Sequence, residues 1–494
     1  MLAAAIVLDG LVRPRPQTVF APVGRSLAGL WLLVWMMAAL IGLFLAISGN
    51  ALVSGALAVA LLALLALVSN AKHAMLGEPL LFSDLALIGA IFRHPQFYLS
   101  AIKVWQRICA GAIAGLLLVI FSLLFVPYLW PHLAGGVLLV GGLAMLAISV
   151  RIAPFNALAR EPDAYADVRR HGLFPSLLLY WLRWRQSRDP APCAPVERRQ
   201  LPAVPETPEL VIIVQCESFA DPVELFTNPG LALPALSEAK RKAWQWGQLD
   251  VYGFGAYTMR TEYGVLFGRS EAALGFRRYD PFLTALGETS YAMPMRLRDA
   301  GWRSLFVHPH DMRFYNRDRL MPASGFDVLV GEDRFAPVSP GAGRYVADTA
   351  VAAQIASLAR DATERTLIYA VTIENHGPWA PEASAEKPDL VQSYLRLVRN
   401  SDAMLASLLD EMAALRRPAM LVFFGDHRPS IPGATAPGEA LHTPYVMMRV
   451  DAAGRIVPGE NRRVDLTPAE LHHAVLDALL GDAVFREKAT NRAA

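Results

Sequence analysis

Four groups of residues that can bind metals or transfer protons follow four short apolar runs in the second half of the chain. The apolar runs are Leu210–Gln215, Ser304–Val307, Thr366–Ile373 and Met420–Gly425. The polar groups after them are, in the same order, Cys216-Glu217-Ser218, His308-Pro309-His310-Asp311, Glu374-Asn375-His376 and Asp426-His427-Arg428. One such group alone is more typical of a solvated loop. Four of them indicate a common site, because sites in open α/β sheets form outside the carboxyl ends of the strands.

Glu217, Asp426 and His427 are the candidate metal ligands. Carboxylate oxygens and imidazole nitrogens suit Mn²⁺, Mg²⁺ or Zn²⁺ and do not suit metals that prefer sulfur ligands. Because Asp426 and His427 are adjacent at a strand end, they can supply two ligands to one ion. The pattern therefore predicts a site for a divalent cation.

The glycine-rich segment Tyr252–Gly268 contains a candidate nucleophile. Glycine lets the backbone approach a bulky anion, and a helix beginning near Thr258 would direct its free N–H groups towards a phosphate. A metal could then lower the pKa of the Thr258 hydroxyl and hold its alkoxide against phosphorus. The alternative is that Thr258 is only the N-cap of this helix, with Thr261 in its first turn. Spacing alone does not distinguish these two interpretations.

The elements that position these residues alternate between strands and helices from about Glu209 onwards. The four apolar runs are typical of buried parallel strands, and Tyr345–Ala362 and Leu390–Leu415 are typical of helices. This alternation predicts an α/β domain with a mainly parallel central sheet, over residues 210–485.

Residues 1–152 are predicted to form an α-helical transmembrane region. Hydrophobic residues make up 54% of the 494 residues and charged residues only 18%, which excludes a disordered chain and argues against a fully soluble enzyme. Ser26–Ala71 and Ile108–Val150 contain no Asp, Glu, Lys or Arg. Each run is long enough for two spans of about 20 residues, so four full spans are expected. A formal net charge of +2 gives no reason to expect a nucleic-acid partner.

Shorter segments flank these predicted spans. Residues 77–92 combine Glu78 and Asp84 with an apolar stretch that is too short to cross a bilayer, and we expect them to lie at the interface. Residues 153–209 are predicted to connect the two regions. They contain an amphipathic segment, Leu173–Trp184, suited to the membrane surface, and a proline-rich linker, Ala191–Leu210.

Five motifs give the chain a resemblance to a known family. They are VIIVQCESFADP, AYTMRTEYGVLFG, FVHPHDMRFYNRDRLMPASGFD, TIENHGPW and FFGDHRPS. In this order they resemble the lipoteichoic acid synthase and phosphoglycerol transferase family, membrane-anchored members of the alkaline phosphatase and sulfatase superfamily. The resemblance covers about Leu210 to Val450 and implies a sulfatase-like fold for this domain.

The resemblance also implies roles for seven residues. Thr258 matches the nucleophile, and the metal-site positions are matched by Glu217, Thr258, Asp426 and His427. Positions that hold the phosphoglycerol group are matched by His308, Arg317 and His376. The implied cofactor is one divalent metal, Mn²⁺ or Mg²⁺, with Zn²⁺ as a further candidate. His442 is either a ligand of a second metal, as in hydrolytic relatives, or a loop histidine ahead of a strand.

The implied reaction transfers phosphoglycerol from phosphatidylglycerol to a hydroxyl of a glycan or polymer, through a phospho-threonine intermediate. A phosphoethanolamine transferase acting on a lipid or glycan is a second interpretation, and a non-catalytic membrane sensor is a third. The chain lacks the CxPSR-type motif of sulfatases, which argues against sulfate ester hydrolysis.

The charge pattern and the family resemblance predict opposite membrane orientations. In a four-span arrangement all the arginine-rich and lysine-rich segments lie on one side, and the positive-inside rule would place the catalytic domain in the cytoplasm. The resemblance implies a fifth span, for which LAAAIVL at residues 2–8 is the candidate remnant. An odd number of spans predicts a multi-pass protein of the inner membrane with a periplasmic catalytic domain.

Overall fold

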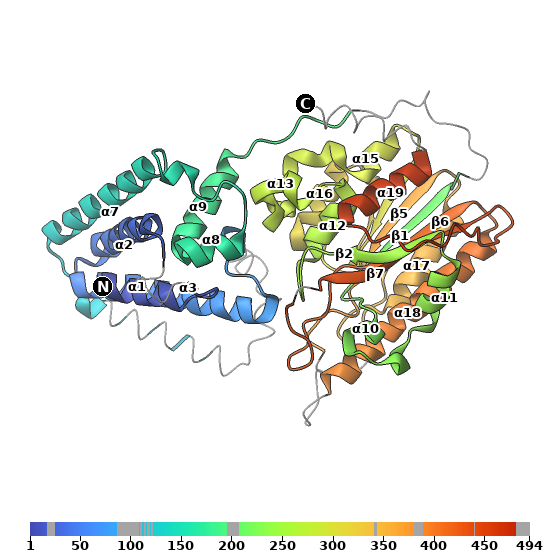
Figure 1. Cartoon of the computed structure of the whole chain (residues 1–494), viewed down its shortest axis with the longest axis horizontal. Helices are drawn as coiled ribbons and strands as arrows, with labels where there is room; N and C mark the ends of the chain where they lie inside the picture. The colour runs from blue at the N-terminus through green and yellow to red at the C-terminus, as the bar shows by residue number, and fades with distance from the viewer. Residues whose placement is uncertain are drawn as a thin grey trace. The chain divides into compact units, whose positions relative to one another are not determined.

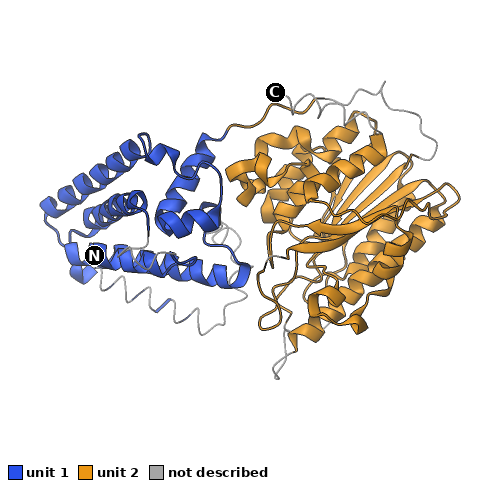
Figure 2. Ribbon diagram, in the orientation of Figure 1, with its two compact units in different colours: residues 1–187 blue, residues 188–494 orange. Residues whose placement is uncertain are grey.

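The computed structural model describes residues 1–16, 25–85, 108, 111–112, 115, 119, 122–194, 207–339, 343–379, 389–438 and 440–480. The chain forms two compact units, Met1–Ser187 and Arg188–Ala494 (Figure 2). The first unit is helical, and the second is built around a β-sheet (Figure 1).

Three helices of the first unit are long and apolar enough to cross a membrane: α2 (Leu27–Ser48), α3 (Ala51–Leu76) and α7 (Leu129–Ser149). A tight turn joins α2 and α3. Gly49 ends α2 in the left-handed conformation, at φ 66°, and the Asn50 side chain accepts hydrogen bonds from two N–H groups that begin α3. These helices make the chain a membrane protein.

Small residues allow α2 and α7 to pack closely. A Cβ atom at Gly135 of α7 would lie 2.2 Å from the backbone nitrogen of Ala46, and one at Gly42 of α2 would lie 2.4 Å from that of Leu139. Close approach at small residues is the usual way in which membrane helices associate.

Other predictions for this unit are only partly covered by the described residues. A shorter apolar helix, α1 (Leu2–Leu11), occupies the position of the suggested span remnant. Most of the span expected between Ile108 and Phe125 lies outside the described residues, as do residues 86–92 of the interfacial segment. Within residues 77–85, the carboxylates of Glu78 and Asp84 both form ion pairs with Lys72.

Two helices follow α7 in the first unit, α8 (Ala164–His171) and α9 (Leu173–Gln186). The second of them coincides with the amphipathic segment predicted from the sequence. Residues 195–206 of the proline-rich linker lie outside the described part of the chain.

The second unit contains a seven-stranded sheet in the order β2-β7-β6-β1-β5-β3-β4. The strands are β1 (Leu210–Cys216), β2 (Gln245–Asp250), β3 (Arg303–Val307), β4 (Val328–Val330), β5 (Thr366–Val371), β6 (Ala419–Gly425) and β7 (His442–Val450). Neighbours from β6 to β4 are parallel, and β2 and β7 are antiparallel additions at one edge. The predicted α/β fold with a mainly parallel sheet is confirmed.

Helices cover both faces of this sheet (Figure 1). One face carries α10 (Pro222–Phe226), α11 (Pro234–Lys242), α17 (Asp348–Asp361) and α18 (Leu390–Leu415). The other carries α12 (Thr258–Phe267), α13 (Glu271–Leu274), α15 (Met293–Arg298), α16 (Arg317–Ala323) and α19 (Pro468–Leu480). A further short helix, α14, spans Pro281–Thr284.

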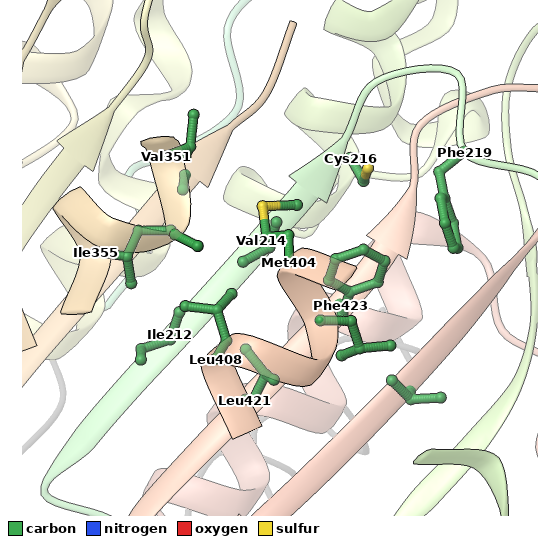
Figure 3. Close-up of a cluster of buried hydrophobic side chains, with 14 of the residues drawn as sticks. Ile212, Val214, Cys216, Phe219, Val351, Ile355, Met404, Leu408, Leu421 and Phe423 are labelled. Carbon is green, nitrogen blue, oxygen red and sulfur yellow. The ribbon is translucent and has the colours of Figure 1, made fainter. Parts of the chain in front are cut away.

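The core beneath α17 and α18 fixes the position of the central strands (Figure 3). Alternate residues of β1, such as Ile212 and Val214, pack with Ile355 of α17 and Leu408 of α18. All seven residues of β1 are buried, because the strand has parallel neighbours on both sides and helices on both faces. The strand therefore ends at a fixed point, immediately before Glu217.

Candidate active site

The register of β1 and β6 brings the acidic residues together. Cys216 pairs with Gly425, so Glu217 and Asp426 leave the sheet side by side. The Asp426 Oδ1 atom accepts a hydrogen bond of 2.8 Å from the backbone N–H of Ser218. From the other neighbouring strand, the Thr372 hydroxyl accepts a hydrogen bond of 3.1 Å from the N–H of Glu217.

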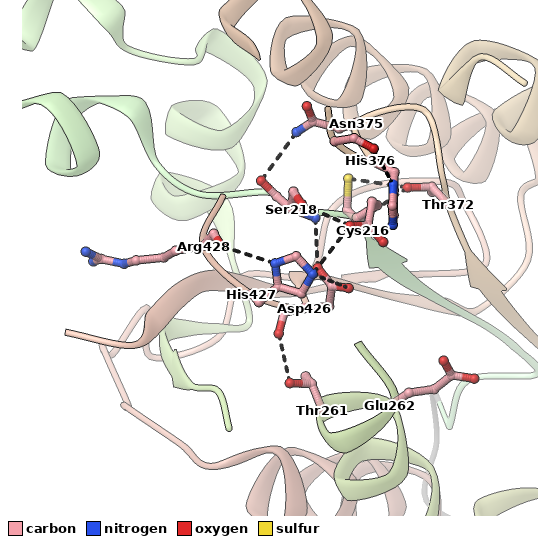
Figure 4. Close-up of polar contacts among 12 residues, drawn as sticks. Cys216, Ser218, Thr261, Glu262, Thr372, Asn375, His376, Asp426, His427 and Arg428 are labelled. Carbon is pink, nitrogen blue, oxygen red and sulfur yellow. Dashed lines mark hydrogen bonds and ion pairs between the residues drawn. The ribbon is translucent and has the colours of Figure 1, made fainter. Parts of the chain in front are cut away.

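Glu217, Asp426 and His427 form a buried cluster. Figure 4 labels two of its members, Asp426 and His427. One candidate ligand atom from each residue lies within 4.8 Å of the others. The His427 Nε2 atom is 3.4 Å from Glu217 Oε1 and 3.6 Å from Asp426 Oδ2. Within the part of the chain that the structure describes, the buried Asp426 Oδ2 has no hydrogen-bond partner. A buried carboxylate oxygen without a partner, beside a second carboxylate and an imidazole, fits a divalent cation.

Electrostatic coupling within the cluster shifts the pKa of each member. Burial disfavours ionised Glu217, but His376, His427 and Ser218 outweigh burial and lower the pKa of this carboxyl to about 2. Burial and the charge of Glu217 raise the pKa of Asp426 to about 6. Burial opposes protonation of His427, but Asp426 and Glu217 raise its pKa to about 9. Without a cation, His427 therefore carries a proton at neutral pH and balances the carboxylates.

Thr258 is the first residue of α12 and lies beside this cluster. The N-cap of the helix is Tyr257, at φ 79°, so the alternative that Thr258 is the N-cap is wrong. A hydrogen bond from the Thr258 side chain contributes to lowering the pKa of Asp426. The Thr261 hydroxyl instead donates to the backbone oxygen of Asp426 at 2.8 Å, which holds α12 against the end of β6 (Figure 4).

In the glycine-rich segment before α12, steric crowding requires glycine at position 255. This residue has φ 66°, and a Cβ atom there would lie 2.3 Å from Cβ of Ser430. Its backbone N–H donates a hydrogen bond of 2.9 Å to the carbonyl oxygen of Arg428. The segment before Thr258 is therefore tied directly to the loop after the Asp426–His427 pair.

His308 and Arg317 form a second buried group. The Arg317 Nη1 atom lies 3.3 Å from His308 Nε2, and the Nδ1 atom of His308 lies 3.0 Å from the carbonyl oxygen of Val371. Arg317 also makes two contacts with Glu262, from Nε to Oε1 at 3.0 Å and from Nη2 to Oε2 at 2.5 Å. Burial, together with the charge of Arg317, lowers the pKa of His308 well below its usual value.

His376 follows β5 on a loop and is exposed. It interacts electrostatically with Glu217, and its ring centroid lies 5.6 Å from that of Tyr345. His442 is the first residue of β7 and is not part of the Glu217 cluster. Its Nε2 atom lies 2.9 Å from Glu224 Oε2 and 2.7 Å from Arg428 Nη2.

Several polar residues around the cluster were not identified from the sequence. Thr372 and Ser218 hold the ends of β1 and β6 in place, but isolated hydroxyl residues give no distinctive signal. Glu262 could have been found, because it is four residues after Thr258 and the two therefore share one face of the helix. Asp348, which interacts electrostatically with Glu217, was also missed.

The buried carboxyl group of Asp348 is expected to make the stability of the folded chain depend on pH. The Asp348 side chain is buried and accepts a hydrogen bond of 2.6 Å from Ser401 Oγ. Burial, followed by the charge of Glu374, raises its pKa to about 7. Between about pH 4 and 7 the folded state therefore binds a proton that the unfolded state does not bind, so stability falls as the pH rises. The free energy at stake is up to about 4 kcal/mol.

We expect Asp348→Asn to flatten the pH dependence of unfolding over this range, because the substitution removes the titrating group. Thermal unfolding of the full chain in detergent, measured from pH 4 to 8, tests this expectation. Asp361→Asn is the matched control, since Asp361 is the exposed last residue of the same helix. A wild-type pH profile in Asp348→Asn would contradict the assignment.

Comparison with known proteins agrees with this fold. The sulfatase family pattern matches residues 209–480, more than half of the chain, and the chain belongs to this family. This result confirms the resemblance to the alkaline phosphatase and sulfatase superfamily.

Two similar sequences come from Rhizobium meliloti (strain 1021). The capsular polysaccharide biosynthesis protein RkpI is 29% identical over 453 residues, covering 88% of this chain and 84% of that protein. A putative cyclic beta-1,2-glucan modification protein is 26% identical over 233 residues, covering 45% of this chain and 36% of that protein.

A solved structure shares the architecture of almost the whole chain. It is the integral membrane lipooligosaccharide phosphoethanolamine transferase A (EptA) from Neisseria meningitidis, with a TM-score of 0.51. The similarity covers 97% of this chain and 95% of that chain at 12% identity, so it concerns the fold.

Proposed function

We propose that this chain transfers phosphoglycerol from phosphatidylglycerol to a glycan or polymer hydroxyl, by double displacement at Thr258. The observation that carries the proposal is the position of the Thr258 hydroxyl beside the cluster of Glu217, Asp426 and His427. A hydroxyl at a helix N-terminus, next to a cation site, is the arrangement that an attack on phosphorus requires.

In the first step the Thr258 oxygen forms a bond to phosphorus, and the bond from phosphorus to the diacylglycerol oxygen breaks. The hydroxyl loses a proton, and the departing diacylglycerol oxygen gains one. In the second step the oxygen of an acceptor hydroxyl forms the new bond to phosphorus and loses its proton, the bond from phosphorus to the Thr258 oxygen breaks, and the Thr258 oxygen regains a proton. The phosphoglycerol group is thereby transferred with its phosphodiester character unchanged.

In the proposed reaction, one set of residues would bind the cation and another would bind the phosphoryl group. Glu217, Asp426 and His427, with Thr258, would hold one divalent cation, Mn²⁺, Mg²⁺ or Zn²⁺. When bound, such a cation lowers the pKa of a coordinated hydroxyl and neutralises negative charge on phosphoryl oxygens. The permanent charge of Arg317 supports the phosphoryl group in both steps. His376, on its exposed loop, is proposed to contact the same group.

Two donor headgroups fit this reaction, glycerol and ethanolamine, and one observation favours glycerol. An aminated headgroup would need an acidic partner. Asp311 is the acidic residue that follows His308 most closely in the motif that carries His308 and Arg317. Its carboxylate is already engaged by Arg313, whose Nη2 atom lies 2.7 Å away. Phosphoethanolamine transfer remains the second candidate because EptA shares the fold.

Two considerations support the acceptor and the location. The two Rhizobium relatives are named for work on a capsular polysaccharide and a cyclic glucan, which supports a glycan acceptor here. A lipid donor is consistent with the membrane helices of the first unit. We propose that the protein is a multi-pass protein of the inner membrane, with the catalytic unit on the periplasmic side.

Mass spectrometry of the covalent adduct tests the proposal. The full chain is incubated with phosphatidylglycerol vesicles and Mn²⁺, without acceptor, and digested. We expect the peptide containing Thr258 to gain one phosphoglycerol group. Phosphatidylethanolamine vesicles are the matched comparison. A phosphoethanolamine adduct would support the second candidate, and no adduct with either lipid would contradict the double-displacement mechanism.

A further inference from the structure

Glu262 lies one helical turn after Thr258 on α12, and its side chain is fully buried. Residues four apart on a helix lie on the same face, so the helix that carries the nucleophile also carries this carboxylate. A buried carboxylate requires a partner, because an unpaired charge in the interior is strongly unfavourable. The partner of Glu262 is Arg317, the first residue of α16.

The contact between Glu262 and Arg317 is bidentate. Two neighbouring guanidinium nitrogens, Nε and Nη2, each contact a different carboxylate oxygen, at 3.0 and 2.5 Å. This arrangement fixes the plane of the guanidinium group as well as its position. The guanidinium carbon also lies 5.2 Å from the ring centroid of Tyr315 and 6.0 Å from that of Phe282.

His308 adds a third constraint. Its Nδ1 atom is 3.0 Å from the carbonyl oxygen of Val371, which can only accept a hydrogen bond, so Nδ1 carries the proton. The neutral ring then accepts at Nε2 from Arg317 Nη1, at 3.3 Å. Glu262 and His308 therefore use three of the five N–H groups of Arg317. Among the described residues nothing else accepts from this guanidinium group, so two N–H groups are left for an anion.

We propose that Glu262 is a positioning residue, which orients the two remaining N–H groups of Arg317 for the phosphoryl group that Thr258 attacks. The inference rests on the proposed function, because it assigns phosphoryl binding to Arg317. Since one helix carries both Thr258 and Glu262, the position of the Arg317 guanidinium group is fixed relative to the proposed nucleophile. Arg317 also interacts electrostatically with Glu217 of the metal cluster.

Phosphate binding distinguishes positioning from simple charge effects. Glu262 is negative, so its removal would strengthen the attraction of an anion if only net charge mattered. If Glu262 positions Arg317, its removal must instead weaken binding, although the site becomes more positive. The sign of the effect therefore separates the two interpretations.

The experiment measures inorganic phosphate binding by titration calorimetry, with the full chain in detergent and Mn²⁺ present. We expect Glu262→Gln to weaken phosphate binding at least tenfold. Arg317→Lys should weaken it to a similar extent, because lysine cannot make the bidentate contact. The double variant should bind no more weakly than Arg317→Lys alone, because Glu262 acts through Arg317.

Glu288→Gln is the matched control. Glu288 is as fully buried as Glu262 and also pairs with arginines, Arg269 and Arg277. This control should lower thermal stability to a similar extent but leave phosphate affinity within twofold of wild type. Should Glu262→Gln fail to fold, Glu262→Asp replaces it, since the carboxylate remains but is one methylene too short for both contacts.

Three outcomes would overturn the inference. They are unchanged or tighter phosphate binding in the Glu262 variant, equal weakening in Glu288→Gln, and additive effects in the double variant. If the wild-type protein binds no phosphate in the presence of Mn²⁺, the proposed function fails together with this inference. If the wild type binds phosphate and the Glu262 variant binds it equally well, only the inference about Glu262 fails.

Discussion

Replacing Thr258 by alanine will abolish phosphoglycerol transfer, with a loss on the order of 10³ to 10⁶-fold in kcat. In the proposed reaction, the Thr258 hydroxyl is the group that forms the bond to phosphorus, so its removal should leave the first step without a nucleophile. Thr261 is the nearest hydroxyl on the helix, but it donates to the backbone oxygen of Asp426. The measurement is release of labelled diacylglycerol from phosphatidylglycerol by the full chain.

Matched variants separate chemistry from folding. Thr258→Ser keeps the hydroxyl and should retain measurable transfer, whereas Thr258→Val keeps the shape and should be inactive. The alanine variant loses the side-chain hydrogen bond to Asp426, so we expect it to lose about 2 kcal/mol of stability and to remain folded. Full turnover by Thr258→Ala would exclude Thr258 as the nucleophile.

Cation binding will depend steeply on pH. The pKa of His427 is raised to about 9 by Asp426 and Glu217 against the effect of burial, so the free protein holds a proton on this ring at neutral pH. A cation can bind the imidazole only after that proton leaves. Affinity for Mn²⁺ should therefore rise about tenfold per pH unit from about pH 6 to pH 9. Below about pH 6, protonation of Asp426 should make the dependence steeper.

Calorimetry in two buffers with different ionisation enthalpies counts the protons released. At about pH 7.5 we expect about one proton for each Mn²⁺ bound. His442→Gln is the control, because His442 lies outside the cluster and its removal should leave proton release unchanged. An affinity that is constant between pH 6 and 9 would show that His427 is not a ligand.

The parallel part of the sheet could be predicted from the sequence because its strands are buried on both faces. Continuous apolar runs such as Leu210–Gln215 and Met420–Gly425 are the direct result of that burial. The edge strands were missed for the opposite reason. β2 is only partly buried and contains two glutamines and an aspartate, and β4 has three residues, so neither has a clear apolar pattern.

The cluster residues were predictable because they combine metal-binding side chains with positions directly after strands. Glu217 and Asp426 directly follow strands that turned out to be neighbours, so the carboxyl-edge argument was sufficient. The pairing of Glu262 with Arg317 joins two helices and was not predictable, because local periodicity does not show which helices meet. The spans near residues 108–125 and the membrane orientation stay predictions.

The register between Cys216 and Gly425 also bears on how the protein folds. Ser218 and Asp426, which bond to each other next to the cluster, are 208 residues apart in the chain. Closing a loop of this length costs more entropy than forming local contacts, so we expect this pairing to form late in folding. A cation bound by this cluster would therefore have no complete binding site until the sheet has assembled, and it would stabilise the finished domain rather than act as a template for its early folding.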